Sequence, residues 1–206
     1  RVLFRSAAIV APLPGFVMYA MSAQLQGLAF HGVDLTPDFE LDEAAMSAAI
    51  RAHRPAITYL AYPNNPTANL WDAGVMRRLI AEAAAMGGLV VIDEAYQPFS
   101  SASWLDEIKR DPEANAHVLL MRTLSKFGLA GVRLGYLCGA KALVDEIDKV
   151  RPPYNVGSLN AEAARFALEH ADEYERQAVV LRAQRERLQA ALQQMAGVTA
   201  FPRSEE

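Results

Sequence analysis

The chain has 206 residues and a formal net charge of −4, with 20 Lys and Arg residues against 24 Asp and Glu residues. That balance gives no indication of a basic surface for nucleic acid or an anionic membrane. Hydrophobic residues make up 52% and charged residues 21%, which is typical of a globular protein with a sizeable core. Cys138 is the single cysteine, so an internal disulfide is excluded and a reducing, cytoplasmic location is expected.

The two ends of the sequence are abrupt. The chain lacks an initiator Met, and Phe201–Glu206 ends where another strand is expected. We therefore expect a central fragment of a longer protein. Arg1–Ser6 and Arg203–Glu206 are expected to be junction residues rather than natural sequence. No apolar run approaches the roughly 18–20 residues of a membrane span, so no membrane partner is expected.

Short apolar runs alternate with longer helical patterns along most of the chain. The runs mostly lack polar alternation, which indicates strands covered on both faces. The predicted strands are Ala7–Ala11, Ala56–Ala61, Leu89–Asp93, His117–Arg122 and Leu134–Cys138. The predicted helices between them are Val17–Gln26, Glu43–Ala52, Asp72–Met86 and Lys141–Val150. This alternation predicts an α/β fold, a mainly parallel sheet with helices on both faces.

The sequence changes character after the break at Arg151-Pro152-Pro153. Ser158–His170 and Asp172–Met195 predict two helices, or one long helix interrupted near Asp172, which would cap the second part. We expect residues 1–157 to form a large domain that is incomplete at its N-terminus. Residues 158–206 would form linking helices and the start of a small domain.

Four polar clusters lie at or just after predicted strand ends, where open α/β sheets bind ligands. They are Tyr62–Asn69, Val90–Tyr96, Met121–Gly128 and Gly131–Tyr136. Taken singly, each has an ordinary explanation, since Asn and Pro are common in turns and most lysines are exposed. Asp93 and Glu94 are less ordinary, because carboxylates at the end of an apolar strand are seldom buried unless paired.

No metal site is predicted from the sequence. The four histidines, His31, His53, His117 and His170, lack the spacing of metal-ligating pairs. A phosphate-loop pattern of Gly, Lys and Ser or Thr is also absent upstream of Asp93, which disfavours a nucleotide hydrolase.

Together, the four clusters resemble one family. Their order matches the fold-type I pyridoxal phosphate-dependent aminotransferases of class I/II: Asn64-Asn65-Pro66-Thr67, Asp93-Glu94-Ala95-Tyr96, Ser125-Lys126 and Arg133-Leu134-Gly135. The resemblance covers nearly all of Ala7–Ala200. Pro14–Tyr19, Asn64–Thr67 and Arg122–Lys126 look most like the histidinol-phosphate aminotransferases. The resemblance implies pyridoxal 5'-phosphate as cofactor and a homodimer of the parent protein.

The same resemblance implies three catalytic residues. Lys126 would bind the cofactor as an imine and later transfer a proton as a general acid and base. Asp93 would pair with the pyridine N–H and keep it protonated, so that the ring accepts electrons. Tyr96, together with Asn65, would donate a hydrogen bond to the ring oxygen.

The remaining predicted cofactor contacts concern the phosphate and the ring face. Thr123, Ser125 and Arg133 would hold the phosphate, the arginine through a charge-assisted fork. Phe16 would stack on the ring, although an ordinary core aromatic explains it almost as well. Tyr19 is a weaker candidate for the same surface.

One position departs from the family pattern. Ala68 stands where the family usually has Gly, at the end of the Asn-Pro-Thr turn. If that position requires a positive φ, alanine would cost about 1 kcal/mol and loosen the turn that carries Asn65.

The reaction implied by the resemblance is amino transfer from histidinol phosphate to 2-oxoglutarate, giving imidazole acetol phosphate and glutamate in histidine biosynthesis. Alternative enzymes are an aromatic or other amino acid aminotransferase, or a lyase or decarboxylase of the same fold. Other classes left open are a ligand-sensing domain of a regulator and a fragment without a function of its own. The resemblance places the arginine that binds the substrate carboxylate and a glycine-rich segment that also cradles the phosphate outside this chain, although Tyr154 and Asn155 resemble a family segment near the substrate pocket.

Overall fold

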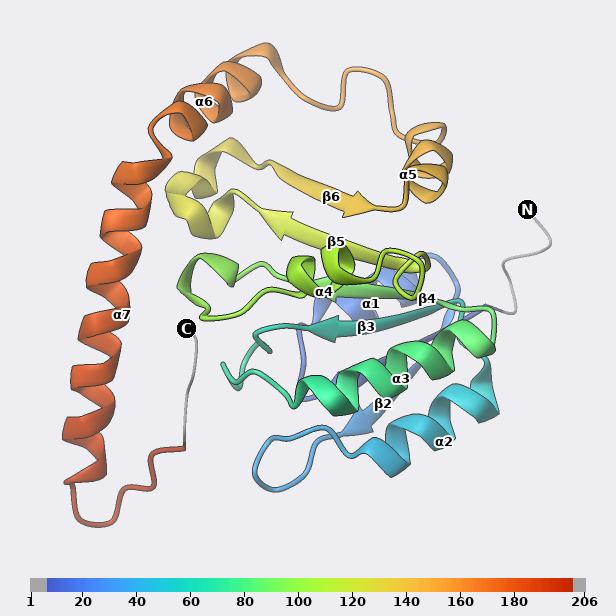
Figure 1. The fold of residues 1–206 in the computed structure, drawn as a ribbon, viewed down its shortest axis with the longest axis horizontal. Coiled ribbons are helices and arrows are strands. Elements are labelled where there is room, and N and C mark those ends of the chain that lie inside the picture. The colour runs from blue at the N-terminus through green and yellow to red at the C-terminus, as the bar shows by residue number, and fades with distance from the viewer. Residues whose placement is uncertain (1–6, 202–206) are drawn as a thin grey trace.

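The structure is a computed structural model that describes residues 7–201 and contains a six-stranded sheet flanked by helices (Figure 1). The strands are β1 (Ala8–Leu13), β2 (Ala29–Asp34), β3 (Ile57–Ala61), β4 (Leu89–Asp93), β5 (Val118–Thr123) and β6 (Gly135–Gly139). Their order is β2-β1-β3-β4-β5-β6, all parallel except β6, which is antiparallel to β5. The prediction of an α/β fold with a mainly parallel sheet is confirmed. The predicted junction residues, Arg1–Ser6 and Arg203–Glu206, lie outside the described range.

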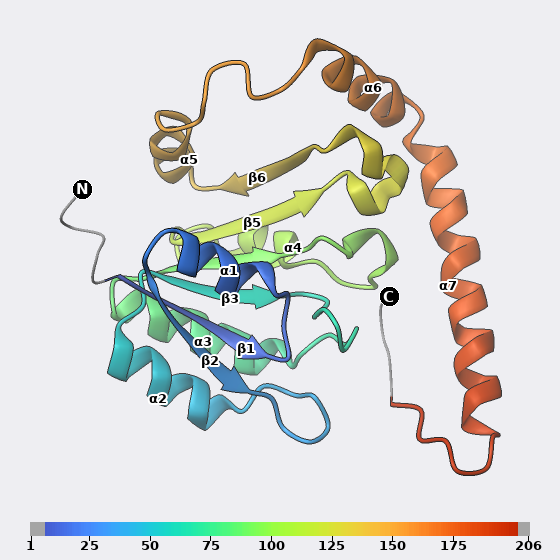
Figure 2. The ribbon, with the colours of Figure 1, turned by 180° about the vertical axis from the view of Figure 1, so that it is seen from behind.

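Helices cover both faces of the sheet. Helix α1 (Met18–Leu25) lies on one face, and α2 (Glu43–His53) and α3 (Ala73–Ala85) lie on the other (Figure 2). The remaining α-helices are α4 (Trp104–Arg110), α5 (Lys141–Asp148), α6 (Ser158–Glu169) and α7 (Ala171–Gln193). Three short segments follow strand ends: η1 (Gln97–Phe99) after β4, and η2 (Ser125–Leu129) and η3 (Ala130–Val132) between β5 and β6.

The main core lies between the sheet and the pair α2 and α3. In α3, the residues that face the sheet recur every three or four positions, as an amphipathic helix requires; they are Met76, Leu79, Ile80 and Ala83. They pack with the buried side chains of the central strands, among them Val10, Leu60, Val90, Ile92, Val118 and Leu120. The rigid strands therefore fix the positions of the polar residues that follow them.

Local signals explain the limits of α3. Asp72 caps its N-terminus by accepting a 2.8 Å hydrogen bond from the Val75 N–H. After Ala85 the chain turns at Gly87, whose φ is +78°, and Gly88 donates to the Ala83 carbonyl at 2.9 Å. The predicted stop at Gly87-Gly88 is confirmed, and it delivers the chain directly into β4.

Two predicted details need correction or addition. Asp172 does not cap a helix: α7 begins at Ala171 after His170, and Asp172 lies in its first turn. There its negative charge faces the positive end of the helix dipole. Strand β2 and helix α4 were not predicted, because β2 is a half-exposed edge strand and α4 has only seven residues.

The long helix α7 lies along the side of the sheet at which the parallel strands end (Figures 1 and 2). Tyr174 packs its ring against Phe127, with centroids 4.8 Å apart. Arg182 and Arg185 donate to the carbonyls of Pro98 and Phe99 at 2.7 and 3.3 Å. Assignment of residues 158–206 to a separate small domain stays a prediction. Among residues 7–201, no helix combines the length and apolarity that crossing a membrane requires.

Candidate active site

A cavity of 820 Å³ opens where β3, β4 and β5 end. It falls within the range of about 300–1,000 Å³ that is common for small-molecule sites. All eight residues that the sequence predicted to contact a cofactor line it: Phe16, Asn65, Asp93, Tyr96, Thr123, Ser125, Lys126 and Arg133. The fold thus brings together residues that span more than half of the chain.

Asp93, the last residue of β4, is buried, with 6% of its surface exposed. Its Oδ2 accepts a 2.6 Å hydrogen bond from the Tyr19 hydroxyl, and its Oδ1 accepts a 3.0 Å bond from the Ala95 N–H. Burial raises the pKa of the Asp93 carboxyl, while these two hydrogen bonds oppose that rise. The result is a fixed carboxylate at the cavity wall that can pair with a cationic N–H group.

The two N-terminal aromatic residues have different environments. Phe16 is 40% exposed and lines the cavity, so the alternative of an ordinary core residue does not apply. Tyr19 is buried and stacks on Tyr59, with centroids 4.3 Å and planes 7° apart. Burial, followed by the charge of Asp93, raises the pKa of the Tyr19 hydroxyl well above its ordinary value. Tyr19 is therefore a neutral donor to Asp93, a role that the sequence did not reveal.

Lys126 lies in η2, a short segment that follows β5 and is interrupted by the non-helical backbone of Gly128. Its Nζ is 4.8 Å from the centroid of the Tyr96 ring. Gly128 has a φ of +118°, and a Cβ added there would lie 2.7 Å from the Tyr174 ring. The loop that presents Lys126 thus requires glycine at position 128 for two independent reasons.

Two hydroxyls and a guanidinium lie together near Lys126. Arg133 donates from Nη1 to Ser125 Oγ at 3.3 Å and to the Ala130 carbonyl at 3.1 Å. Thr123 Oγ1 accepts from the Ser125 N–H at 3.0 Å and donates to the Leu134 carbonyl at 3.3 Å. Thr123 therefore shapes the loop as well as lining the cavity. An arginine beside serine and threonine hydroxyls is a donor set that suits a phosphate group.

The loop after β3 is held by Asn64, which the sequence analysis did not single out. The buried Asn64 donates to the Pro14 carbonyl at 3.1 Å and to Thr67 Oγ1 at 2.7 Å. Ala68 has a φ of +62°, so the expected positive φ is confirmed. The Ala68 N–H donates to the Asn64 carbonyl at 2.8 Å, and the expected loosening of the turn stays a prediction. Asn65 is left on the cavity wall.

An ion pair between a cavity-lining arginine and a buried glutamate lies at this edge of the sheet. Glu94 is fully buried and accepts from Arg122 Nε and Nη2 at 2.9 and 2.8 Å. Ser103 donates to both carboxylate oxygens at 3.0 Å. Burial raises the pKa of the Glu94 carboxyl, and the Arg122 guanidinium opposes that rise. The expectation that these strand-end carboxylates are paired holds for Glu94, with a partner that the sequence did not identify.

The donor set fits the cofactor that the family resemblance implies. One cavity presents a carboxylate at Asp93, an amine at Lys126 and an anion-binding group at Arg133. A ligand with a basic ring nitrogen, a carbonyl carbon and a phosphate could engage all three at once.

Sequence comparison identifies a family and its members. The family described as aminotransferase class I and II matches residues 2–204. Histidinol-phosphate aminotransferase of Acidovorax sp. strain JS42 is 69% identical over 192 residues, which are 93% of this chain and 52% of that protein. The enzyme of the same name from Methylibium petroleiphilum is 69% identical over 196 residues, 95% of this chain and 52% of the relative. The chain thus spans about half the length of the curated relatives it matches.

Structure comparison agrees on the fold. Histidinol-phosphate aminotransferase from Sinorhizobium meliloti, solved in complex with pyridoxal-5'-phosphate, superposes with a TM-score of 0.81 at 25% identity. The match covers 97% of this chain and 53% of that one. The enzyme of the same name from Clostridium acetobutylicum has a TM-score of 0.83 at 20% identity, covering 99% of this chain and 62% of that chain, and supports the fold alone.

Proposed function

The chain belongs to the class I and II aminotransferases, and on that basis we propose that its full-length protein uses pyridoxal 5'-phosphate for amino transfer. The donor is histidinol phosphate and the acceptor is 2-oxoglutarate, with imidazole acetol phosphate and glutamate as products in histidine biosynthesis. The observation that carries this proposal is the convergence of Lys126, Asp93 and Arg133 on one cavity. The choice of substrate rests on relatives of that name at 69% identity.

Each site residue has a task in this reaction. When bound, the cofactor supplies a carbonyl carbon and an electron-withdrawing ring. Lys126 would hold the cofactor through its amine, and the free amine would move a proton as a positioned base. The Tyr96 ring, 4.8 Å from Nζ, limits where the amine can lie.

Two groups hold the opposite ends of the cofactor. Asp93 would keep a proton on the ring nitrogen, and the hydrogen bonds from Tyr19 and Ala95 favour the charged form of Asp93 inside a buried site. Arg133, with Ser125 and Thr123, would bind the phosphate dianion. Asn65 and Tyr96 would donate to the ring oxygen, and Phe16 would cover the ring face.

The proposal includes the setting in which the protein works. We propose a homodimer in the cytoplasm, acting on small molecules and on neither nucleic acid nor membranes. The large domain comprises residues 1–157, and the segment 158–206 begins the small domain.

The decisive experiment uses the purified full-length protein in two steps. Wild-type protein should show the visible absorption of bound cofactor, and Lys126→Ala should lose it. Lys109→Ala, which changes a lysine in the last turn of α4, away from the cavity, is the matched control and should keep the absorption. An unchanged Lys126→Ala spectrum would refute cofactor attachment at this residue.

The second step concerns the substrate. Initial rates are compared for histidinol phosphate and for phenylalanine, each with 2-oxoglutarate as acceptor. We expect kcat/KM to favour histidinol phosphate. A strong preference for phenylalanine would instead identify an aromatic amino acid aminotransferase. Cofactor binding without turnover of either donor would favour the ligand-sensing alternative.

A further inference from the structure

The ion pair of Glu94 and Arg122 joins two strands at the edge where the site lies. Glu94 follows Asp93 directly, and its N–H donates to the Met121 carbonyl of β5 at 2.8 Å. Arg122 lies on β5, four positions before Lys126. The pair therefore links the strand end that carries the carboxylate to the strand end that leads to the amine.

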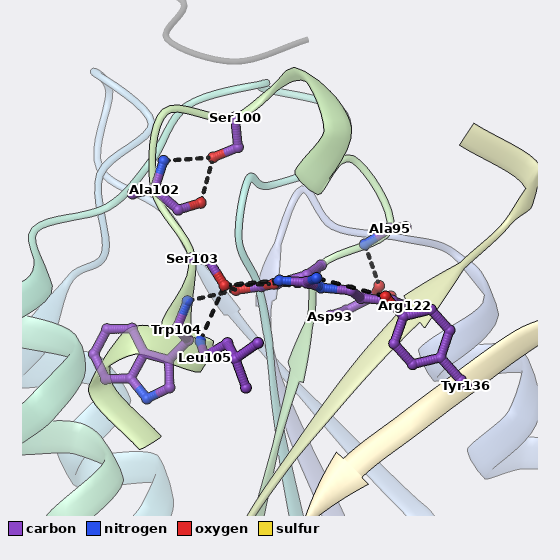
Figure 3. Close-up of polar contacts among 10 residues, drawn as sticks. Asp93, Ala95, Ser100, Ala102, Ser103, Trp104, Leu105, Arg122 and Tyr136 are labelled. Atoms are coloured by element: carbon purple, nitrogen blue, oxygen red, sulfur yellow. Dashed lines mark hydrogen bonds and ion pairs between the residues drawn. The ribbon is translucent and has the colours of Figure 1, made fainter. Parts of the chain in front are cut away.

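Glu94 is held in one position from several sides. The side chain is fully buried and receives two hydrogen bonds from Arg122 and two contacts from Ser103. Its Oε1 also accepts from the Trp104 N–H, at the start of α4. Arg122 in turn donates from Nη2 to Ser103 at 2.8 Å (Figure 3). Because the planar guanidinium binds both Glu94 and Ser103, the ends of β4 and β5 have little freedom to shift relative to each other.

The edge of the Arg122 guanidinium that does not bind Glu94 faces the cavity. Arg122 lines the cavity, its side chain is 17% exposed, and its Nη1 lies 3.5 Å from the Tyr136 hydroxyl. Tyr136 lines the same cavity. The guanidinium thus contributes a charge to the cavity wall, and Glu94 supplies the balancing charge from behind.

We propose that Glu94 and Arg122 are positioning residues of the cofactor site, fixing the spacing between Asp93 and Lys126 and keeping the cavity wall electrically balanced. The inference rests on the proposed function, since it concerns the same cofactor. The motifs alone give Glu94, which directly follows Asp93, and its partner Arg122 no task in cofactor binding, and this proposal assigns them one.

The charges around the cavity explain why this pair matters. The other charged residues that line it are Asp93, Lys126, Arg133 and Arg151. Arg151 is already paired with Asp148, at 2.6 Å. Without the charge of Glu94, the Arg122 guanidinium would add an uncompensated positive charge to a wall that carries Lys126 and Arg133. A positive charge disfavours protonation of the nitrogen that joins Lys126 to the cofactor.

The test compares variants of the full-length protein by two measurements, the cofactor dissociation constant and the pH midpoint of the visible absorption. Glu94→Gln keeps the shape and removes the charge. We expect its midpoint to fall by about one pH unit, the shift of a unit charge roughly 10 Å away at an effective dielectric constant near 20. We expect the dissociation constant to rise about tenfold, as for loss of a charge-assisted buried hydrogen bond.

Two further variants make the test specific. Glu43→Gln breaks a comparable fork with Arg78, at 2.6 and 2.8 Å, on the exposed surface of α2 and α3, and should change neither measurement. The double variant Glu94→Gln/Arg122→Gln removes both charges together. Its midpoint should return to the wild-type value while its dissociation constant stays raised.

The outcomes separate this inference from the proposed function. A wild-type protein without the visible absorption would overturn both. A wild-type absorption with an unchanged midpoint and affinity in Glu94→Gln would overturn the inference alone. If Glu94→Gln does not fold, the double variant decides: weaker cofactor binding at the wild-type midpoint supports the inference, and unchanged binding overturns it.

Discussion

The hydroxyl of Tyr19 donates a 2.6 Å hydrogen bond to Oδ2 of Asp93, a residue 74 positions later in the chain. Tyr19 belongs to α1 on one face of the sheet, and Asp93 ends β4 within it. The bond therefore ties a covering helix to the carboxylate at the centre of the site, and four predictions start from this region.

Tyr19→Phe should make cofactor binding more sensitive to acid. The lost hydrogen bond favoured the ionised carboxylate, so the pKa of Asp93, already raised by burial, rises further. As the pH falls, Asp93 then takes up its proton earlier and no longer pairs with the ring nitrogen. Cofactor titrations between about pH 5 and 8 should show weakening that begins at higher pH than in wild type. Tyr59→Phe, which leaves the Tyr19 bond in place, is the control.

Asp93→Asn should alter the pH dependence of stability in the cofactor-free protein. Because the folded-state pKa of Asp93 is raised, its contribution to stability is present below the unfolded value of about 3.9 and is lost as pH rises through the folded value. Asn does not titrate, so the stability of the variant relative to wild type should increase with pH across that window. Urea unfolding at several pH values measures the difference, and a difference independent of pH would contradict the assignment.

Gly128→Ala should destabilise the loop that presents Lys126. A φ of +118° is unfavourable for alanine, and the added Cβ would meet the Tyr174 ring at 2.7 Å. The cost of such strain and overpacking is on the order of 2–4 kcal/mol in the free energy of unfolding. Gly131→Ala is a matched control three residues away, since a Cβ added there would meet no atom of residues 7–201 within 4 Å. Equal losses in both variants would argue against the contact with Tyr174.

Arg133→Lys should weaken cofactor binding while preserving the charge. Lysine carries a single point charge and cannot reproduce the planar fork that arginine offers to a phosphate. We expect the cofactor dissociation constant to rise about tenfold, as for loss of one charge-assisted hydrogen bond. Inorganic phosphate should also compete less well with the cofactor in this variant. Arg187→Lys, on the exposed surface of α7, should leave both measurements unchanged.

The parts of the fold that were predicted are those with strong local signals. β4 was predicted to the residue, because Gly87-Gly88 marks its start and its interior is uniformly apolar. Edge strand β2 escaped notice, since burial on one side leaves a weak pattern interrupted by Gly32. Local patterns predict elements that are buried on both faces better than elements at the rim.

The residues of the candidate site differ in the same way: those in local motifs were predicted, and contacts between distant segments were not. Lys126, Asp93 and Arg133 were found because each lies in a motif at a strand end. Asp93 and Lys126 lie at the carboxyl ends of parallel strands, and Arg133 precedes the antiparallel strand β6, whose start lies at the same edge of the sheet. The contacts of Tyr19 with Asp93 and of Arg122 with Glu94 join residues 74 and 28 positions apart. Such pairings depend on how strands and helices pack, which no local pattern encodes. The roles assigned to the motif residues stay predictions until the cofactor is measured.

Helix α7 supports two of the loops that line the cavity. It contacts the Lys126 loop through Tyr174 and the segment after Tyr96 through Arg182 and Arg185. The segments that follow Tyr96 and contain Lys126 are therefore both held by contacts to one helix. We expect a displacement of α7 against the sheet to move both segments, so the position of this helix affects two parts of the cavity wall at once.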